Sequence, residues 1–195
     1  MEITSSALTG ALRVGIQVII ARRRPVLEIY QNLHNNFGPP IEFSTGLNTS
    51  KIEKYRFQDI FVDLTLINIV GVRAENVTFE LTGNFKREKP RENHPELFKT
   101  KMRQLAPGQA IYLMRIDNHD LQTYAGEKEG DNSVMRPAGI KSDTLTICAH
   151  YDGPSNILNR LLRWPRRWRG LKQYALRFTF DPQVVVGDLP PAKYA

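Results

Sequence analysis

The stretch at residues 61–83, FVDLTLINIVGVRAENVTFELTG, contains two runs in which apolar and polar residues alternate. The apolar side chains of each run share one face: Val62, Leu64 and Leu66 in the first, and Val77, Phe79 and Leu81 in the second. Alternation with a period of two is the pattern of a strand with one buried face. The short turn between the runs predicts that they pair as an antiparallel hairpin. Nothing in the stretch is catalytic.

Short strands are expected along most of the remaining chain. We expect them at residues 26–33, 109–116, 143–151 and 172–181, with an edge strand within 41–47. Loops are expected at 34–40 and at 84–104, and the second of them includes a short helical turn at 95–101. Residues 125–139 are expected to form a loop or a hairpin crossing. The inward apolar faces are predicted as Leu27, Ile29 and Leu33; Leu145, Ile147, Ala149 and Tyr151; and Tyr174, Leu176, Phe178 and Phe180. Short strands without regular helices between them predict an all-β antiparallel sandwich.

A local motif carries a family resemblance. Asn68, Gly71, Ala74, Asn76 and Val77 give an Asn/Gly turn followed by A-x-N-V at the start of a strand, and a Pro-Gly turn precedes another strand. This order resembles the bacterial immunoglobulin-like sandwich domains of the cell-adhesion-related type, with the glycine one place from the family's position. The resemblance covers about residues 26–186 and implies an immunoglobulin-like fold, a binding or spacer role and no catalytic residue.

Length and composition are those of one globular domain with additions. The chain has 195 residues, 41% of them hydrophobic and 24% charged, and nine Phe, seven Tyr and two Trp exceed what a disordered chain carries. Cys148 is the single cysteine, so no internal disulfide can form, and its place within a strand pattern favours a structural residue over a nucleophile. We expect residues 25–195 to form the sandwich.

The positive charge is concentrated in two segments. The net charge is +7; residues 153–180 carry +7 without any acid, residues 1–24 carry +3, and the remainder carries −3. Two basic surfaces on a nearly neutral body favour polyanionic neighbours such as lipid headgroups or nucleic acid, although a basic run often marks only a solvated face.

Residues 1–24 form the first of these segments and predict a helix that ends before Pro25. The apolar positions cover a wide arc and the polar ones a narrow strip. We predict an attachment helix in which the relevant residues are Leu8, Leu12, Arg13, Ile16, Ile19, Arg22, Arg23 and Arg24. It could span a membrane, although Arg13 at mid-span costs about 2.5–3.5 kcal/mol. It could also lie in the interface, pack on partner helices or oligomerise, or fold back on its own domain.

Residues 156–172, NILNRLLRWPRRWRGLK, form the second basic segment, here called the basic loop, and interrupt the connection to the last strand. We predict a helical insert that binds anions or membranes through Arg160, Arg163, Trp164, Arg166, Arg167, Trp168, Arg169 and Lys172. Arginine pairs with phosphate, and tryptophan suits a headgroup boundary or stacks on a base. The alternative is a short helix that caps one end of the sandwich.

No common catalytic, cofactor-binding or metal-binding signature occurs. His119 and Asp120 are expected to be surface residues at a strand end, and His150, Asp152 and Ser155 form only a weak hydrolytic candidate. We therefore expect no catalytic, cofactor or metal site. The expected function is a non-enzymatic interaction or scaffold module in the cytoplasm, at the inner face of a membrane or on partner helices. The alternatives are a nucleic-acid-binding accessory protein and a non-catalytic subunit of an enzyme complex.

Overall fold

The computed structural model describes residues 24–44, 52–87, 95–129, 132–155, 164–166, 168–187 and 193–194. The fold is mostly β, and the helices are short, as the alternating sequence pattern predicts. The strands are β1 (Leu27–Ser44), β2 (Ile52–Asn68), β3 (Ala74–Gly83), β4 (Met102–Leu105), β5 (Ala110–Asp117), β6 (Gln122–Glu129), β7 (Asn132–Ile140), β8 (Leu145–Asp152), β9 (Tyr174–Phe180) and β10 (Lys193–Tyr194). The helices are η1 (Pro95–Phe98), α2 (Asn118–Leu121) and α4 (Pro182–Gly187).

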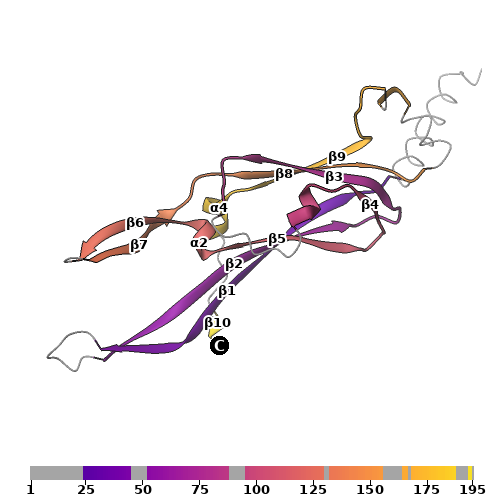
Figure 1. The fold of residues 1–195 in the computed structure, drawn as a ribbon. Helices are drawn as coiled ribbons and strands as arrows, with labels where there is room; N and C mark the ends of the chain where they lie inside the picture. The colour runs from indigo at the N-terminus through magenta and orange to yellow at the C-terminus, as the bar shows by residue number, and fades with distance from the viewer. Residues whose placement is uncertain are drawn as a thin grey trace, which may run out of the picture.

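Two four-stranded sheets and one hairpin make up the fold. The strand orders are β10-β1-β2-β5 and β4-β3-β8-β9, and β6 pairs with β7. All pairs are antiparallel except β1 with β10. The two larger sheets lie face to face, and the β6–β7 hairpin projects from one end (Figure 1). Buried residues from both sheets belong to one hydrophobic cluster.

The two alternating runs at 61–83 do not pair with each other, so the predicted hairpin is wrong. β2 lies between β1 and β5, whereas β3 lies between β4 and β8 in the other sheet. Residues 69–73 therefore cross from one sheet to the other. Asn68 stabilises the crossing, because its Nδ2 donates to Val72 O at 2.8 Å and to Leu105 O at 3.1 Å. Alternation fixes which face of a strand is buried but carries no information about its partner.

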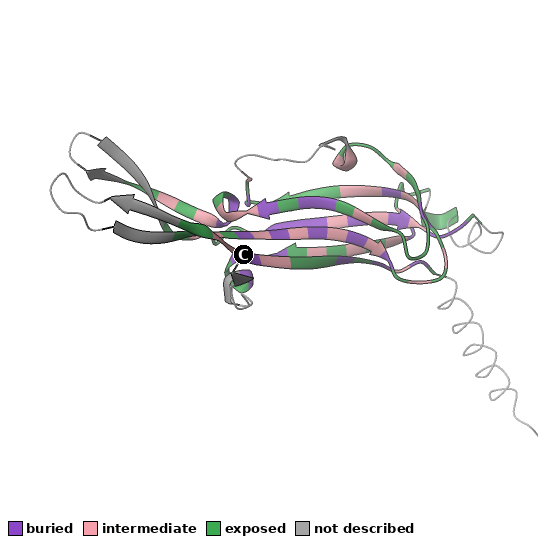
Figure 2. Cartoon of the chain, turned by 90° about the horizontal axis from the view of Figure 1, so that it is seen from below, coloured by how far each residue is buried: buried purple, intermediate pink, exposed green. Residues whose placement is uncertain are grey.

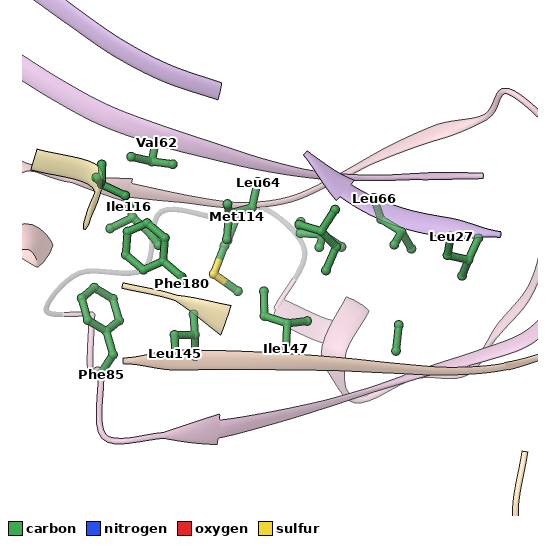
Figure 3. Packing of buried hydrophobic residues seen from close by; sticks show 14 of the residues in the cluster. Leu27, Val62, Leu64, Leu66, Phe85, Met114, Ile116, Leu145, Ile147 and Phe180 are labelled. Atoms are coloured by element: carbon green, nitrogen blue, oxygen red, sulfur yellow. The ribbon is translucent and has the colours of Figure 1, made fainter. Parts of the chain in front are cut away.

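The buried faces of the central strands agree with the sequence. Val62, Leu64 and Leu66 face the buried side chains of the opposite sheet, with Phe180 among them (Figure 3). The predicted face of β8 is also buried, namely Leu145, Ile147, Ala149 and Tyr151. Phe79 and Phe178 are half-buried and pack against the core, whereas Leu81 is exposed. Burial is therefore greatest in the middle of the sandwich and decreases toward the hairpins (Figure 2).

β1 is longer than the sequence indicates. The predicted loop at 34–40 continues the strand, with a register shift between Phe37 and Pro40. Proline has no N–H to donate, and a bulge is one of the places where a strand accommodates it. β1 and β2 thereby extend as a long hairpin beyond the sandwich, at the same end as the β6–β7 hairpin that forms at the predicted loop or crossing (Figure 1).

Several predicted features lie outside the described residues. Of the predicted attachment helix, only Arg24 is described, so the helix at 1–24 stays a prediction. In the part of the chain that the structure describes, no helix has the length and apolar character of a membrane span. The predicted helical turn near residue 95 is confirmed as η1.

Candidate anion-binding surface

The described part of the basic loop contains one helical turn. The Trp168 N–H donates to Trp164 O at 3.3 Å, and the Leu171 N–H donates to Arg166 O at 3.0 Å. Gly170 ends the turn with a φ of 68°, a conformation that glycine adopts without the steric cost of a Cβ. These hydrogen bonds hold residues 164–166 and 168–171 close to one another.

Both indoles of the loop face solvent. Trp164 is 65% exposed and Trp168 is 83% exposed, and Leu171 beside them is 61% exposed. The two indole rings meet edge to face, with their centroids 5.9 Å apart. These three large apolar side chains form an exposed surface that the core does not use. The leucines that would cap the sandwich in the alternative interpretation lie outside the described residues.

The structure describes five of the eight residues predicted to bind anions: Trp164, Arg166, Trp168, Arg169 and Lys172. Arg160, Arg163 and Arg167 lie outside the described residues. Arg166 Nη1 donates to the backbone oxygen of Gln173, so this guanidinium is held against the start of β9. Lys172 Nζ lies 3.7 Å from Asp152 Oδ2 at the end of β8. The loop is thus tied to both strands that it connects.

A cleft of about 410 Å³ lies beneath the loop. Among the described residues, its charged lining consists of Lys101, Arg166 and Lys172 with one carboxylate, that of Asp152. We name it the Asp152 cleft. Three cations against one anion leave the cleft positive, and they come from three places: the segment before β4, the helical turn and the segment before β9. An anion in this cleft would therefore meet positive charge from several sides.

Asp152 organises the wall of this cleft. Its Oδ2 accepts a hydrogen bond from Asn76 Nδ2 at 3.2 Å, and its Oδ1 accepts one from the Gln173 N–H at 3.1 Å. Gln173 is buried, and its Oε1 accepts from the Gly153 N–H at 3.2 Å. The carboxylate thus fixes β3, β8 and the end of the basic loop relative to one another.

Asn76 occupies a special backbone position in this wall. Its φ is 56°, the only positive value among the described residues other than glycine. It lies at the register shift between Glu75 and Thr78, where β3 bulges against β8. Asparagine is among the residues that tolerate the left-handed region. The bulge turns the Asn76 amide toward Asp152 instead of leaving it in the regular alternation of the strand.

Arg24, the one described residue of the first basic segment, lies at the same end of the sandwich as the described part of the basic loop. Arg24 lines a second cleft, of about 380 Å³, together with Tyr151 and Tyr174, and Gln173 lines both clefts. Burial raises the pKa of Tyr151, while the backbone of Leu27 and the positive charge of Arg24 act in the opposite direction. Figure 1 shows β1 beginning at the end where β8 stops and β9 starts. We name this end the basic end.

His150, Asp152 and Ser155, the weak hydrolytic candidates, contact different partners. His150 Nε2 lies 3.5 Å from Glu80 Oε2, whereas Ser155 Oγ donates to Glu75 Oε2 at 3.1 Å. Asp152 is bound by Asn76 and Gln173. The described residues therefore do not join these three side chains in a nucleophile–base relay. They also contain no group of three or more His, Cys, Asp or Glu that could hold a metal ion.

His119 and Asp120 differ from their predicted setting at a strand end. They belong to α2, where the Asp117 carboxylate caps the first turn and Asp120 completes a capping box. Asp120 is buried, and His119 is exposed with its ring hydrogen-bonded to Tyr124. The prediction that both are surface residues is wrong for Asp120, because the capping box draws its carboxylate back onto the backbone.

A second polar cluster covers the outer face of the other sheet. Arg115 donates to Asp63 through Nε at 2.8 Å and through Nη2 at 3.0 Å, and Tyr112 OH donates to the same carboxylate at 3.2 Å. The Arg115 guanidinium also lies 3.9 Å from the centre of the Phe61 ring, on which His34 stacks. Such cross-strand pairs stabilise a solvated sheet face.

Sequence reasoning missed three residues of the cleft. Lys101 and Asn76 stand far from the basic loop in the chain, and nothing next to them in sequence marks an anion site, whereas Gln173 directly follows the loop but is uncharged. Strand register brings them together, because Glu75 pairs with Asp152 and Tyr151 pairs with Tyr174. The one local signal was Asn76 within A-x-N-V, which we read only as a fold motif.

Comparison with models of known protein families, with curated proteins and with solved structures finds no match for this chain. The function therefore has to be argued from the geometry of the basic end.

Proposed function

We propose that this chain is a non-enzymatic interaction module of the immunoglobulin-like type, attached by its basic end to the cytoplasmic face of an anionic membrane. The body of the sandwich and its two long hairpins then remain available to a protein partner. In this proposal the predicted helix at 1–24 and the basic loop act together as one attachment surface. Either an inserted helix or a helix packed on partner helices is compatible with this arrangement.

The observation that carries the proposal is the meeting of Arg24 and the basic loop at one end of the molecule. The two segments are separated by more than a hundred residues in sequence, yet Gln173 lines both the cleft of Arg24 and that of Arg166 and Lys172. Each basic residue near an anionic bilayer contributes about 1 kcal/mol of binding free energy. Basic residues on one shared surface contact the bilayer at the same time, so their contributions add. Basic residues at opposite ends of the molecule could not contact one bilayer together.

The exposed indoles favour a membrane over a purely electrostatic partner. Trp164 and Trp168 project from the same turn as Arg166 and Arg169, with Leu171 beside them. Tryptophan concentrates at the boundary between headgroups and acyl chains, where its ring is half apolar and its N–H remains hydrated. A duplex backbone offers no comparable environment to an indole.

The proposal is tested by pelleting the full chain with anionic vesicles at low and high salt. Changing Arg163, Arg166, Arg167 and Arg169 to Gln should abolish the salt-sensitive part of binding, because that part is Coulombic. Changing Trp164 and Trp168 to Ala should weaken the part that survives salt. As a matched control, Lys86, Lys99, Arg103 and Arg177 are changed to Gln, which removes the same charge from outside the loop. Equal losses in the control and the loop variant would overturn the proposal.

The nucleic-acid alternative rests on the same exposed indoles, since aromatic rings stack on unpaired bases. It predicts tighter binding to a single strand than to vesicles. On duplex, it predicts a salt slope of about −0.9 per neutralised phosphate. Measuring both nucleic acids beside the vesicles, with the same variants, separates the two functions.

A further inference from the structure

The Asp152 cleft has features that the remainder of the basic end lacks. Exposed arginines on a loop attract any anionic surface, but they do not select a chemical group. The cleft is concave, has a volume of about 410 Å³ and is lined by side chains from separate elements that the framework of the sandwich holds in place. Concave sites with a few convergent polar groups are the usual form of a small-ligand site.

The single carboxylate of the cleft is already compensated. Asp152 accepts hydrogen bonds from Asn76 Nδ2 and from the Gln173 N–H, and Lys172 Nζ lies 3.7 Å from it. Its negative charge therefore positions Lys172 and the wall of the cleft, and it opposes an incoming anion less than a free carboxylate would.

The other cations keep donors for a ligand. Among the residues that the structure describes, Lys101 has neither a hydrogen bond nor an ion pair, so its three N–H donors are open to solvent. Arg166 donates to the Gln173 backbone oxygen from Nη1, and a guanidinium has five N–H donors in total. These two side chains reach the cleft from different segments of the chain.

Taking these features together, we propose that the Asp152 cleft binds the terminal phosphate monoester of an anionic lipid headgroup. This inference rests on the proposed membrane attachment. A phosphate monoester carries between one and two negative charges near neutral pH and has three free acceptor oxygens. A phosphate diester within a headgroup carries one negative charge and has two free acceptor oxygens. Three cations arranged around one concave site suit the first chemistry. Trp164, Trp168 and Leu171 would enter the bilayer beside the bound headgroup.

The test compares the full chain on two kinds of phosphatidylcholine vesicle. One contains phosphatidic acid, which presents a monoester, and the other contains phosphatidylglycerol, which presents a diester, at contents that give equal zeta potentials. The parent chain should bind the phosphatidic acid vesicles more tightly. Lys101→Gln should weaken binding to the phosphatidic acid vesicles by about fivefold or more, the loss that one basic residue at the surface accounts for, and should weaken binding to the phosphatidylglycerol vesicles less. Lys99→Gln is the matched control, because Lys99 is exposed, carries the same charge and does not line the cleft.

A third arm separates a lipid phosphate from a free one. Excess inorganic phosphate, at constant ionic strength, should abolish the preference for phosphatidic acid and leave binding to phosphatidylglycerol unchanged. If inorganic phosphate binds in a Lys101-dependent manner while the vesicles are bound equally, the lipid source of the phosphate is overturned.

The remaining outcomes also decide the matter. Equal binding of the parent to both vesicles without Lys101-dependent phosphate binding would overturn the inference and leave the proposed membrane attachment intact. Equal effects of Lys101→Gln and Lys99→Gln would do the same. Failure of the parent to bind either vesicle would overturn the proposed function itself.

Discussion

The Asn76 Nδ2 atom donates a hydrogen bond of 3.2 Å to Asp152 Oδ2, which joins a left-handed residue of β3 to the last residue of β8. The bond crosses the bulge between these strands. Because Asp152 also receives the Gln173 N–H, one carboxylate connects three segments at the basic end. The shape of the cleft therefore depends on a backbone conformation that few residues adopt.

The first prediction concerns this conformation. Asn76→Gly should change the free energy of unfolding by about 1 kcal/mol or less, because the lost hydrogen bond is offset by the ease with which glycine adopts a positive φ. Asn76→Val should cost at least about 1 kcal/mol more, because a β-branched residue is strained there. Urea unfolding of both variants measures the difference. Equal costs would show that the left-handed conformation is unimportant to stability.

The second prediction ranks two phenylalanines of β9. Phe180 is fully buried and packs edge to face against Phe85, with the ring centroids 5.7 Å apart. Phe178 is half-buried. Phe180→Ala should lower the free energy of unfolding by about 3–5 kcal/mol, and Phe178→Ala should lower it by less. Chemical unfolding of both variants is the measurement. An equal or larger loss for Phe178→Ala would mean that the edge strand is more enclosed than its exposure indicates.

The third prediction concerns acid stability. Burial acts to raise the pKa of Asp63, but the hydrogen bonds and charge of Arg115, with Tyr112 and His34, outweigh it and hold the pKa below its ordinary value. A carboxylate with a lowered pKa stabilises the fold above its unfolded pKa of about 3.9, and this stabilisation is lost as the pH falls through the folded value.

Asp63→Asn should therefore lower stability near pH 7 and flatten the loss of stability below about pH 4. Urea midpoints of the parent and the variant across this range give the comparison. Parallel curves for the two proteins would contradict the assigned role of the Asp63–Arg115 pair.

The fourth prediction separates attachment from folding. A chain that begins at Pro25 should keep its β-rich far-UV spectrum, because it retains all of β1, which begins at Leu27, and every core residue that the structure describes. The salt-resistant part of its vesicle pelleting should weaken, because only Trp164 and Trp168 remain to supply it. Aggregation of the shortened chain would instead indicate that residues 1–24 cover apolar surface of the sandwich.

The candidate site was only partly visible in the sequence. Trp164, Arg166 and Trp168 stand close together in the chain, so composition alone identified them as a basic aromatic segment. Lys101 and Asn76 could not be assigned to the same place, because the contacts that unite them are between strands distant in sequence. The sequence marks Asp152 only as a weak hydrolytic candidate, whereas in the structure its carboxylate is a hydrogen-bond acceptor in the wall of the cleft.

The sequence by itself determined the β class of this protein and the buried faces of its central strands, since alternation reports burial residue by residue. It also located both basic segments. The tertiary structure alone decided that β2 and β3 lie in different sheets, that Leu81 is exposed, and that Arg24, Lys101 and Lys172 line clefts at one end. The physical reason is that strand pairing depends on backbone hydrogen bonds and register, which no local alternation of side chains specifies.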